Sequence, residues 1–364
     1  MHLNLSLSTL YKISDMLVKT IKPISLACLL LSPIVNSTDL PSWQNTVLPN
    51  SPSLRGSAMI DNSLWVSGGN NIVFVSQDAG KTWLDKSVDI PLKTGFRDIA
   101  LFDSKTAIVM GAGSGEQSVL YKTIDGGDSW QLLYQNIDKE GFFDSIAFWD
   151  RNNGLLMGDP VDGFYVIKKT IDGGKTWRRI SINNIPQFVE KEAAFAASGN
   201  TLIVGEKGKA WLTTGGFSAS VYSSDDFGET WQRHAVPLFS DTQTAGGYGL
   251  ALNHQQQIFV VGGDYEQRPA SYPNISTFTN NTWQAVSAGQ HGLRSAMSCQ
   301  GYICITTGKT SSDISFNAGK SWQVLDNPMG KKEDKGFYTL ASSKMMFLAA
   351  GSDGKVGVYS FRGK

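Results

Sequence analysis

The sequence has little of what metal and nucleotide sites require. Its 364 residues include three cysteines and four histidines, and these show no metal-ligand spacing. No Ser-His-Asp nucleophile elbow is present. The glycine-rich segment GAGSG at 111–115 leads into an apolar, strand-like run rather than a helix, which excludes a phosphate-binding loop. The sequence therefore predicts no metal site and no bound cofactor.

An excess of charge and long helical periodicity are also absent. The 32 basic and 32 acidic residues cancel, so the chain lacks the basic surplus typical of nucleic-acid binders. No long segment repeats with the 3.6-residue period of a helix. Short apolar runs bounded by Gly, Ser, Asn and Asp recur instead, as in FRDIALFD, TAIVMGAG and SVLYKTI before residue 124. This pattern predicts an all-β protein.

The first 37 residues differ from the rest. Lys19 and Lys22 precede a 12-residue apolar core, ISLACLLLSPIV, and then VNS before Thr38. This arrangement predicts a signal peptide cut near Ser37. The apolar core is shorter than the roughly 20 residues that a membrane-spanning helix needs. We expect an exported protein, periplasmic or extracellular, with residues 38–364 as one domain and no transmembrane segment after cleavage. A lipoprotein anchored through Cys28 is the alternative.

An octet recurs along the chain with the pattern Ser/Thr-x-Asp-x-Gly-x-Thr/Ser-Trp. In this pattern the aspartate can accept hydrogen bonds from backbone N–H groups further on, and the glycine permits positive φ. The tryptophan then opens a strand with a large apolar surface. Each octet is therefore predicted to be a structural turn, and a calcium loop is the weaker alternative because alternating carboxylates are missing. The five octets are centred on Asp78, Asp125, Asp172, Asp226 and, in a weaker copy, Asn317.

This pattern resembles the Asp-box, or BNR repeat, of bacterial sialidases, sortilin-type receptors and photosystem II stability/assembly-factor-like proteins. The resemblance covers nearly all of the chain after residue 38. It implies a β-propeller in which each box is a structural turn at a blade edge, remote from any active centre. The segment FFDSIAFWDRNNGLLMGDPVDG at 142–163 is similar to the assembly-factor-like group in particular.

The spacing of the tryptophans predicts the number of blades. The octet residues 83, 130, 177 and 231 are 47, 47 and 54 positions apart, close to the length of a four-stranded blade, and 283 and 322 continue the series. Residues 336–361 supply three strands and no tryptophan, whereas SWQNTVL at 42–48 resembles an outer strand. We therefore predict seven blades, the last completed by the N-terminal strand. A six-bladed ring is the alternative.

Two cysteines outside the leader, Cys299 and Cys304, flank a probable hairpin turn. Their positions are compatible with a disulfide in an oxidising compartment. Two reduced core cysteines are the alternative.

Aligning the repeats on GFRDIALF places polar residues where innermost strands begin, around a predicted central channel. Such charges need partners or a ligand when they are buried. The sequence leaves open whether they pair with one another or bind an anionic or polyhydroxyl ligand. Two loops are candidates for the same face, GDPVDGF with Asp159 and GGDYEQRP with Asp264 and Tyr265. The predicted ligand-binding residues are Arg55, Arg97, Asp98, Lys191 and Arg294, and the candidate catalytic residues are Asp144, Glu192, Tyr248 and Tyr338.

The sequence favours a binding or assembly scaffold with a protein partner or an anionic or carbohydrate ligand. The alternative is a sialidase-like glycoside hydrolase that uses the arginines, a tyrosine and a carboxylate. RGSA at 55–58 departs from the sialidase Arg-Ile-Pro start, and seven blades depart from the sialidase six. Fold analogy by itself does not assign this chemistry.

Overall fold

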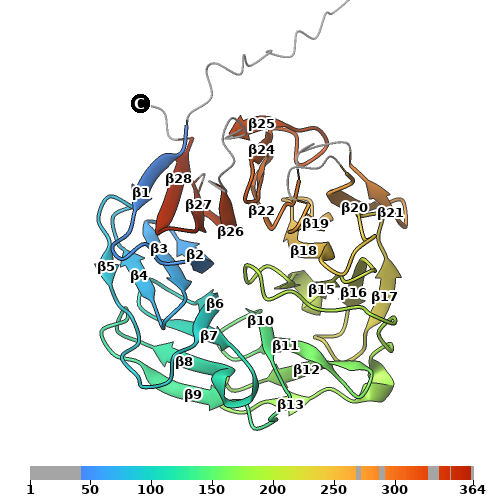
Figure 1. The fold of residues 1–364 in the computed structure, drawn as a ribbon, viewed down its shortest axis with the longest axis horizontal. Coiled ribbons are helices and arrows are strands. Elements are labelled where there is room, and N and C mark those ends of the chain that lie inside the picture. The colour runs from blue at the N-terminus through green and yellow to red at the C-terminus, as the bar shows by residue number, and fades with distance from the viewer. Residues whose placement is uncertain (1–41, 268–271, 287–291, 327–335, 345, 362–364) are drawn as a thin grey trace, which may run out of the picture. The chain divides into compact units, whose positions relative to one another are not determined.

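The computed structural model describes residues 42–267, 272–286, 292–326, 336–344 and 346–361. The predicted leader, residues 1–37, lies outside these ranges. Within the described residues the strands form seven antiparallel four-stranded sheets, which are the blades of a ring (Figure 1). This confirms the all-β, seven-bladed propeller and shows that the six-bladed alternative was wrong.

Blades one to six each use four consecutive strands, from the inner strand outward. Blade one contains β2 (Leu54–Ile60), β3 (Ser63–Gly68), β4 (Val73–Ser76) and β5 (Leu84–Asp85). Blade two contains β6 (Gly95–Leu101), β7 (Ala107–Ala112), β8 (Val119–Thr123) and β9 (Gln131–Gln135). Blade three contains β10 (Phe143–Phe148), β11 (Gly154–Val161), β12 (Phe164–Thr170) and β13 (Arg178–Arg179).

The second half of the ring follows the same order. Blade four contains β14 (Leu202–Val204), β15 (Ala210–Thr214), β16 (Ser220–Ser224) and β17 (Gln232–Ala235). Blade five contains β18 (Ala245–Leu252), β19 (Ile258–Asp264), β20 (Ile275–Thr279) and β21 (Thr282–Ala285). Blade six contains β22 (Ala296–Gln300), β23 (Ile303–Thr307), β24 (Ser312–Ser315) and β25 (Gln323–Asp326). Short 3-10 turns lie at η2 (Gly115–Gln117), η3 (Ile182–Asn184) and η4 (Glu206–Gly208).

Blade seven joins the two ends of the described chain. Its sheet contains β26 (Phe337–Ser343), β27 (Met346–Gly351), β28 (Lys355–Ser360) and, outermost, β1 (Gln44–Val47). Gln44 lies opposite Val358 in the β1–β28 pair. The Trp43 ring packs 5.6 Å from that of Tyr359, measured between centroids. The predicted closure by the N-terminal strand is confirmed, and β1 covers the edge of β28 that three strands alone would leave exposed.

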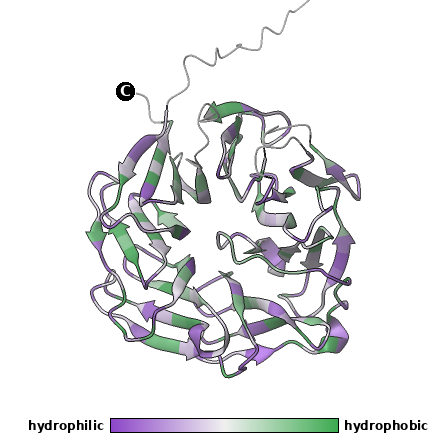
Figure 2. Cartoon of the chain, viewed as in Figure 1, coloured by the Kyte–Doolittle hydropathy of each residue, from purple (hydrophilic) through white to green (hydrophobic). Residues whose placement is uncertain are grey.

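Apolar side chains fill the interfaces between neighbouring blades. One cluster combines Trp65 and Val75 of blade one with Val109 and Tyr121 of blade two, and comparable clusters lie between other adjacent blades. Hydrophobic and hydrophilic residues alternate along many of the strands (Figure 2). Successive side chains of a strand point to opposite faces, and every residue of β3 and β27 is buried, so these sheets pack against a neighbour on both sides.

The octets close the turns that link the third and outer strands. In the first, Asp78 accepts hydrogen bonds from Ser76 Oγ at 2.8 Å, from the Thr82 backbone N–H at 2.9 Å and from Thr82 Oγ1 at 2.7 Å. Gly80 has φ of 87°. Trp83 Nε1 donates to the Gly80 carbonyl oxygen at 3.2 Å. The bonds to the aspartate recur at Asp125, Asp172 and Asp226, and Asn317 replaces the carboxylate with an amide. In the second octet Trp130 Nε1 donates instead to the Lys86 carbonyl oxygen, at 2.9 Å.

A loop replaces the start of the inner strand in blade four. Here β14 has three residues, and the preceding residues 194–201, which we call the central loop, contact the inner strands of other blades (Figure 1). Ser198 Oγ donates to the Ser295 carbonyl oxygen at 2.9 Å, and the Ser198 carbonyl oxygen accepts from Thr339 Oγ1 at 3.0 Å. The Leu250 N–H donates to the Asn200 carbonyl oxygen at 2.8 Å. The central loop is therefore held where the inner strands converge.

Candidate functional site

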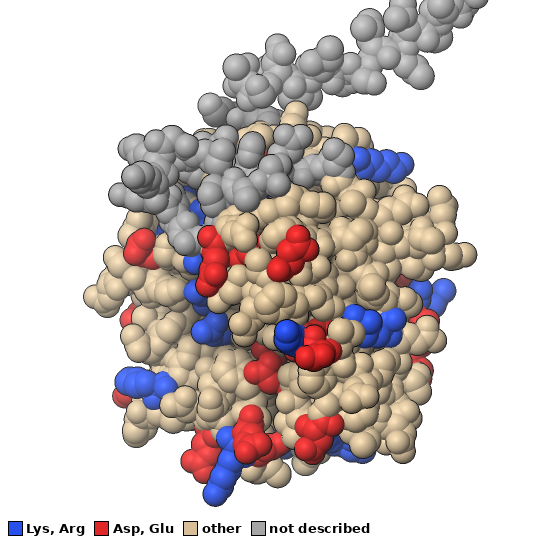
Figure 3. Space-filling view, turned by 45° about the vertical axis from the view of Figure 1, so that its right-hand side comes forward, with Lys and Arg blue, Asp and Glu red and all other residues tan. Residues whose placement is uncertain are grey.

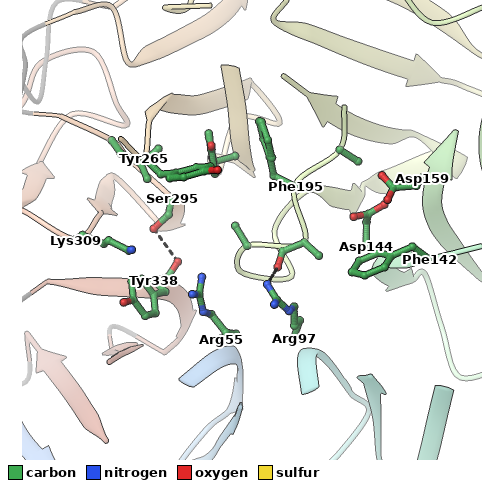
Figure 4. A pocket seen from close by; sticks show the side chains of 15 residues that line it. Arg55, Arg97, Phe142, Asp144, Asp159, Phe195, Tyr265, Ser295, Lys309 and Tyr338 are labelled. Carbon is green, nitrogen blue, oxygen red and sulfur yellow. Dashed lines mark hydrogen bonds between the residues drawn. The ribbon is translucent and has the colours of Figure 1, made fainter. Parts of the chain in front are cut away.

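A cavity of about 410 Å³ lies between the central loop and the first residues of several inner strands (Figure 4). Arg55 enters it from β2, Arg97 from β6 and Asp144 from β10. Phe195 comes from the central loop and Tyr338 from β26. Four residues predicted from separate repeats, Arg55, Arg97, Asp144 and Tyr338, thus line one cavity, with Tyr248 of β18 as the fifth.

One wall of the cavity is basic. The Arg55 guanidinium carbon lies 4.1 Å from the centre of the Tyr338 ring, a cation–π contact. Arg97 donates from Nη1 to the Ala196 carbonyl oxygen at 2.7 Å. Burial lowers the pKa of both arginines, and the charge of Arg97 lowers that of Arg55 further. Neither forms an ion pair within the described part of the chain, so both cations are available to an anionic ligand. Lys309 Nζ lies 5.0 Å from the centre of the Tyr338 ring and extends this wall.

The wall across the cavity is acidic. Asp144 is 1% exposed, and its Oδ2 has no hydrogen-bond partner among the described residues. The Asp159 carboxyl, from β11, faces it (Figure 4). Burial raises the pKa of Asp144 well above its ordinary value, the charge of Asp159 adds to the rise, and Arg97 opposes it. Burial also raises the pKa of Asp159.

Aromatic rings form the remaining side. The Phe195 and Tyr248 rings are stacked, with centroids 4.4 Å apart and planes at 9°. The Tyr248 hydroxyl donates to the Thr244 carbonyl oxygen at 2.6 Å, and burial raises its pKa. This phenol is therefore neutral and already engaged, which argues against its predicted role as a nucleophile. Tyr265 also lines the cavity and is 41% exposed.

Asp98 lies outside this cavity because it is adjacent to Arg97 on β6 and points to the opposite face of the strand. Its buried carboxylate accepts hydrogen bonds from the Ile99 N–H at 2.7 Å, and from Ser145 Oγ and the Ile146 N–H, both at 2.8 Å. Burial raises the pKa of Asp98 to about 7, while these hydrogen bonds lower it. Asp98 lines a second cavity, of about 540 Å³, with Gly199 of the central loop.

Glu192 and Lys191 precede the central loop and also lie outside the cavity. Glu192 is buried in blade four, where it accepts hydrogen bonds from Thr214 Oγ1 and, at 3.1 Å, from the Tyr222 hydroxyl. Lys191 is exposed, and its Nζ lies 5.5 Å from the centre of the Phe217 ring. The expectation that Lys191 and Glu192 lie at the beginning of a regular inner strand was wrong, because the inner strand of blade four begins at Leu202, after the central loop.

Arg294 is a buried structural residue rather than part of the basic wall. It is 0% exposed, and its Nε donates to Asp313 Oδ2 at 2.9 Å in an ion pair within blade six. Its neighbours Leu293 and Ser295 line the cavity instead. The placement of Arg294 beside Arg97 at a common opening is therefore corrected.

The central loop, Phe142, Leu293, Ser295 and Lys309 also line the cavity and were missed from the sequence. The loop sequence AFAASGNT is rich in small residues, and these allow the backbone to approach the inner strands closely. At Gly199 a Cβ atom would lie 2.4 Å from Asp98 Oδ1, and its φ is 72°. That composition is the signal that distinguishes this repeat from the others.

Two other features bear on the class of protein. Among the residues that the structure describes, no helix has the length and hydropathy of a membrane span. Across the same residues, no cluster of three or more His, Cys, Asp or Glu side chains is arranged to hold a metal ion. The face seen in Figure 3 carries acidic and basic side chains interspersed, so the basic wall is a local feature.

The ring of seven blades and its octet turns define a BNR-type β-propeller. A family model described as "Photosynthesis system II assembly factor YCF48" matches residues 85–188. The chain thus resembles these assembly factors in blades two and three, where the match lies. No curated protein matches the sequence.

Solved structures extend the likeness to nearly the whole chain. "YCF48 bound to D1 peptide" shares 16% identity over 88% of this chain and 96% of that one, with a TM-score of 0.65. YCF48 from Cyanidioschyzon merolae shares 15% over 88% and 99%, with a TM-score of 0.64. A GH74 xyloglucanase from Xanthomonas campestris shares 12% over 88% of this chain and 54% of its own, with a TM-score of 0.62. At these identities the likeness establishes the fold alone.

Proposed function

We propose that this chain is an exported binding scaffold that holds an acidic segment of a partner protein in the cavity beside the central loop. The observation that carries the proposal is the pair of half-buried arginines, Arg55 and Arg97, which form no ion pair within the described residues. Guanidinium groups removed from water bind carboxylates through charge-assisted hydrogen bonds. Phe195, Tyr248 and Tyr338 add aromatic surface for side chains of the same segment.

The comparisons and the leader support this proposal. The family model describes an assembly factor, and one protein of the same fold is described as bound to a peptide. Export rests on the signal-peptide pattern of residues 1–37, and a periplasmic or extracellular compartment suits the Cys299–Cys304 disulfide. In this proposal the octets are Asp-boxes with a structural role, since their bonds are local and they do not line the cavity.

A peptide array tests the proposal. The mature protein, residues 38–364, is incubated with peptides that cover exported and membrane proteins of its host, and bound acidic peptides are then titrated in solution. Arg55→Ala should weaken their binding by about 10- to 100-fold, because a hydrogen bond to a charged group contributes roughly 1.5 to 3 kcal/mol. Arg179→Ala, which removes an exposed arginine from β13, is the matched control and should bind normally. Equal binding by the Arg55→Ala variant would overturn the proposal.

A glycoside hydrolase is the second candidate, because Asp144 and Asp159 form a buried carboxyl pair in a cavity, as glycosidase sites do. This pair differs from the predicted combination, in which Tyr248 or Tyr338 is the nucleophile and Asp144 or Glu192 is the acid/base. A screen of fluorogenic sialosides and other glycosides tests it. Turnover that disappears in Asp144→Asn would establish the enzyme, and the absence of turnover across the screen would reject it.

A further inference from the structure

The carboxyl groups of the acidic wall, Asp144 and Asp159, have no role in the binding of an anionic ligand proposed above. Asp144 is 1% exposed, and its Oδ2 has no hydrogen-bond partner among the residues that the structure describes, although it lines a cavity. A buried carboxylate oxygen without a donor costs free energy, so a bound donor at this position would be favourable. Asp159 faces the same space from β11 and doubles the acceptor capacity (Figure 4).

Within the described residues, neither Arg55 nor Arg97 donates a hydrogen bond to Asp144. Arg97 influences Asp144 through its charge, but it forms no ion pair with either carboxyl within the described residues, and its Nη1 is bonded to Ala196. Arg55 is held over the Tyr338 ring. The basic and acidic groups therefore line one cavity from neighbouring blades, and no ion pair joins them within the described residues.

We infer that the cavity is a dipolar site, in which Asp144 and Asp159 bind a lysine or arginine side chain of the same partner segment whose acidic group binds Arg55 and Arg97. This inference rests on the proposed binding function and specifies its ligand. A cationic donor between the two carboxyls satisfies the unpartnered oxygen and offsets their mutual repulsion. A segment with one acid and one base also adds no net charge to the cavity, which limits the cost of removing both groups from water.

Capped peptides test the inference. Each carries one Glu and one Lys, separated by zero to four residues of Ala and Tyr, and matched peptides replace Lys by Gln or Glu by Gln. Binding to the mature protein is measured by titration calorimetry. We expect one or two spacings to bind best and the Lys→Gln peptide to bind about tenfold more weakly. The Asp144→Asn/Asp159→Asn variant should remove this preference for Lys while it still binds the Glu-only peptide.

Controls separate failure of this inference from failure of the proposed function. Asp162→Asn changes an exposed carboxyl at the turn between β11 and β12 and should leave the preference for Lys intact. If Glu-only and dipolar peptides bind wild type equally, and Arg55→Ala weakens both, the dipolar site is wrong and the anionic site stands. If no peptide binds, both are wrong. Melting curves establish that each variant is folded.

Discussion

Arg97 of blade two donates a hydrogen bond from Nη1 to the carbonyl oxygen of Ala196 in the central loop, across 2.7 Å. The contact joins positions 99 residues apart in the chain, and it orients the guanidinium along the cavity wall. Arg97 therefore holds the loop and supplies charge to the site at the same time. In the proposed function, loop order and ligand binding are coupled through this one side chain.

Replacing Arg97 should loosen the central loop. Arg97→Ala removes a hydrogen bond from a charged donor, so local stability should fall by roughly 1.5 to 3 kcal/mol. Hydrogen exchange followed by mass spectrometry should show faster exchange in peptides that cover residues 194–201. The octet at 170–177 should keep its wild-type exchange. Unchanged exchange in the loop would show that the remaining contacts, such as that between Ser198 and Thr339, hold it without Arg97.

Replacing Arg294 should destabilise the protein. Arg294→Met leaves the buried Asp313 carboxylate without its cation, which typically costs 3 to 5 kcal/mol, here taken as about 4. The double variant Arg294→Met/Asp313→Leu should recover most of that loss, because no charge is left buried. Denaturant titration measures both. A single variant as stable as wild type would contradict the structural role assigned to this pair.

An octet aspartate should support stability in a pH-dependent way. Hydrogen bonds from Thr176, first its side chain and then its backbone, lower the pKa of Asp172 to about 2. A depressed carboxyl pKa stabilises the fold above the unfolded-state value, near 4, and this contribution is lost as pH falls toward 2. Asp172→Ala should therefore cost about 1 kcal/mol at neutral pH and progressively less in acid, since the side chain is only partly buried. Melting temperatures from pH 7 to pH 2 test this, and peptide binding at neutral pH should be unchanged.

The buried carboxyl pair should have the opposite dependence. Burial raises the pKa of Asp144, with Asp159 adding to the rise and Arg97 opposing it. A raised carboxyl pKa contributes stability below the unfolded value, near 4, and that contribution is lost as pH rises through the folded value. Asp144→Asn does not ionise, so its melting temperature should match wild type near pH 4 and exceed it at pH 8 by at least about 2 °C. A wild type that is the more stable at pH 8 would show that Asp144 has a favourable partner when charged.

The disulfide should contribute modestly. Cys299 and Cys304 lie opposite each other on β22 and β23 and close a loop of six residues. Because short loops restrict the unfolded chain little, reduction should lower the unfolding free energy by at most about 2 kcal/mol. Melting temperature with and without reductant measures the effect. The variant Cys299→Ala/Cys304→Ala should not respond to reductant, and a large response in that variant would assign the effect to something other than the bridge.

The architecture could be predicted from the sequence because the octets form turns through local hydrogen bonds. The aspartate of each octet accepts its hydrogen bonds from residues of the same octet, so Ser76, Asp78, Gly80 and Thr82 specify a turn wherever they recur. The spacing of the following tryptophans then predicts one blade for each repeat. The missing outer strand near the C-terminus and the matching segment at 42–48 predict the closure, because an unpaired edge strand is avoided in a ring.

Only part of the cavity lining could be predicted from the sequence. Its inner-strand members, Arg55, Arg97, Asp144, Tyr248 and Tyr338, were predicted because equivalent positions in repeated blades point to a common centre. Asp98 was grouped with them, yet strand alternation turns it toward Ile146 and the second cavity. Which of two adjacent side chains faces the cavity depends on the register between the inner strand and the strand that pairs with it. In blade two this register shifts at a bulge between Phe96 and Asp98.

Tertiary structure decided the rest. Arg294, which precedes β22, pairs with Asp313 of β24. The sequence around these two residues does not indicate whether Arg294 pairs with Asp313 or binds a ligand. The central loop takes its place from hydrogen bonds to β6, β10, β18 and β26 and to Ser295 before β22, which lie in five other blades. The sequence by itself determined the repeat, the number of blades and the closure, because those depend on contacts within a repeat or between the chain ends. The cavity and its two charged walls depend on how blades distant in sequence converge, and only the assembled ring settles that.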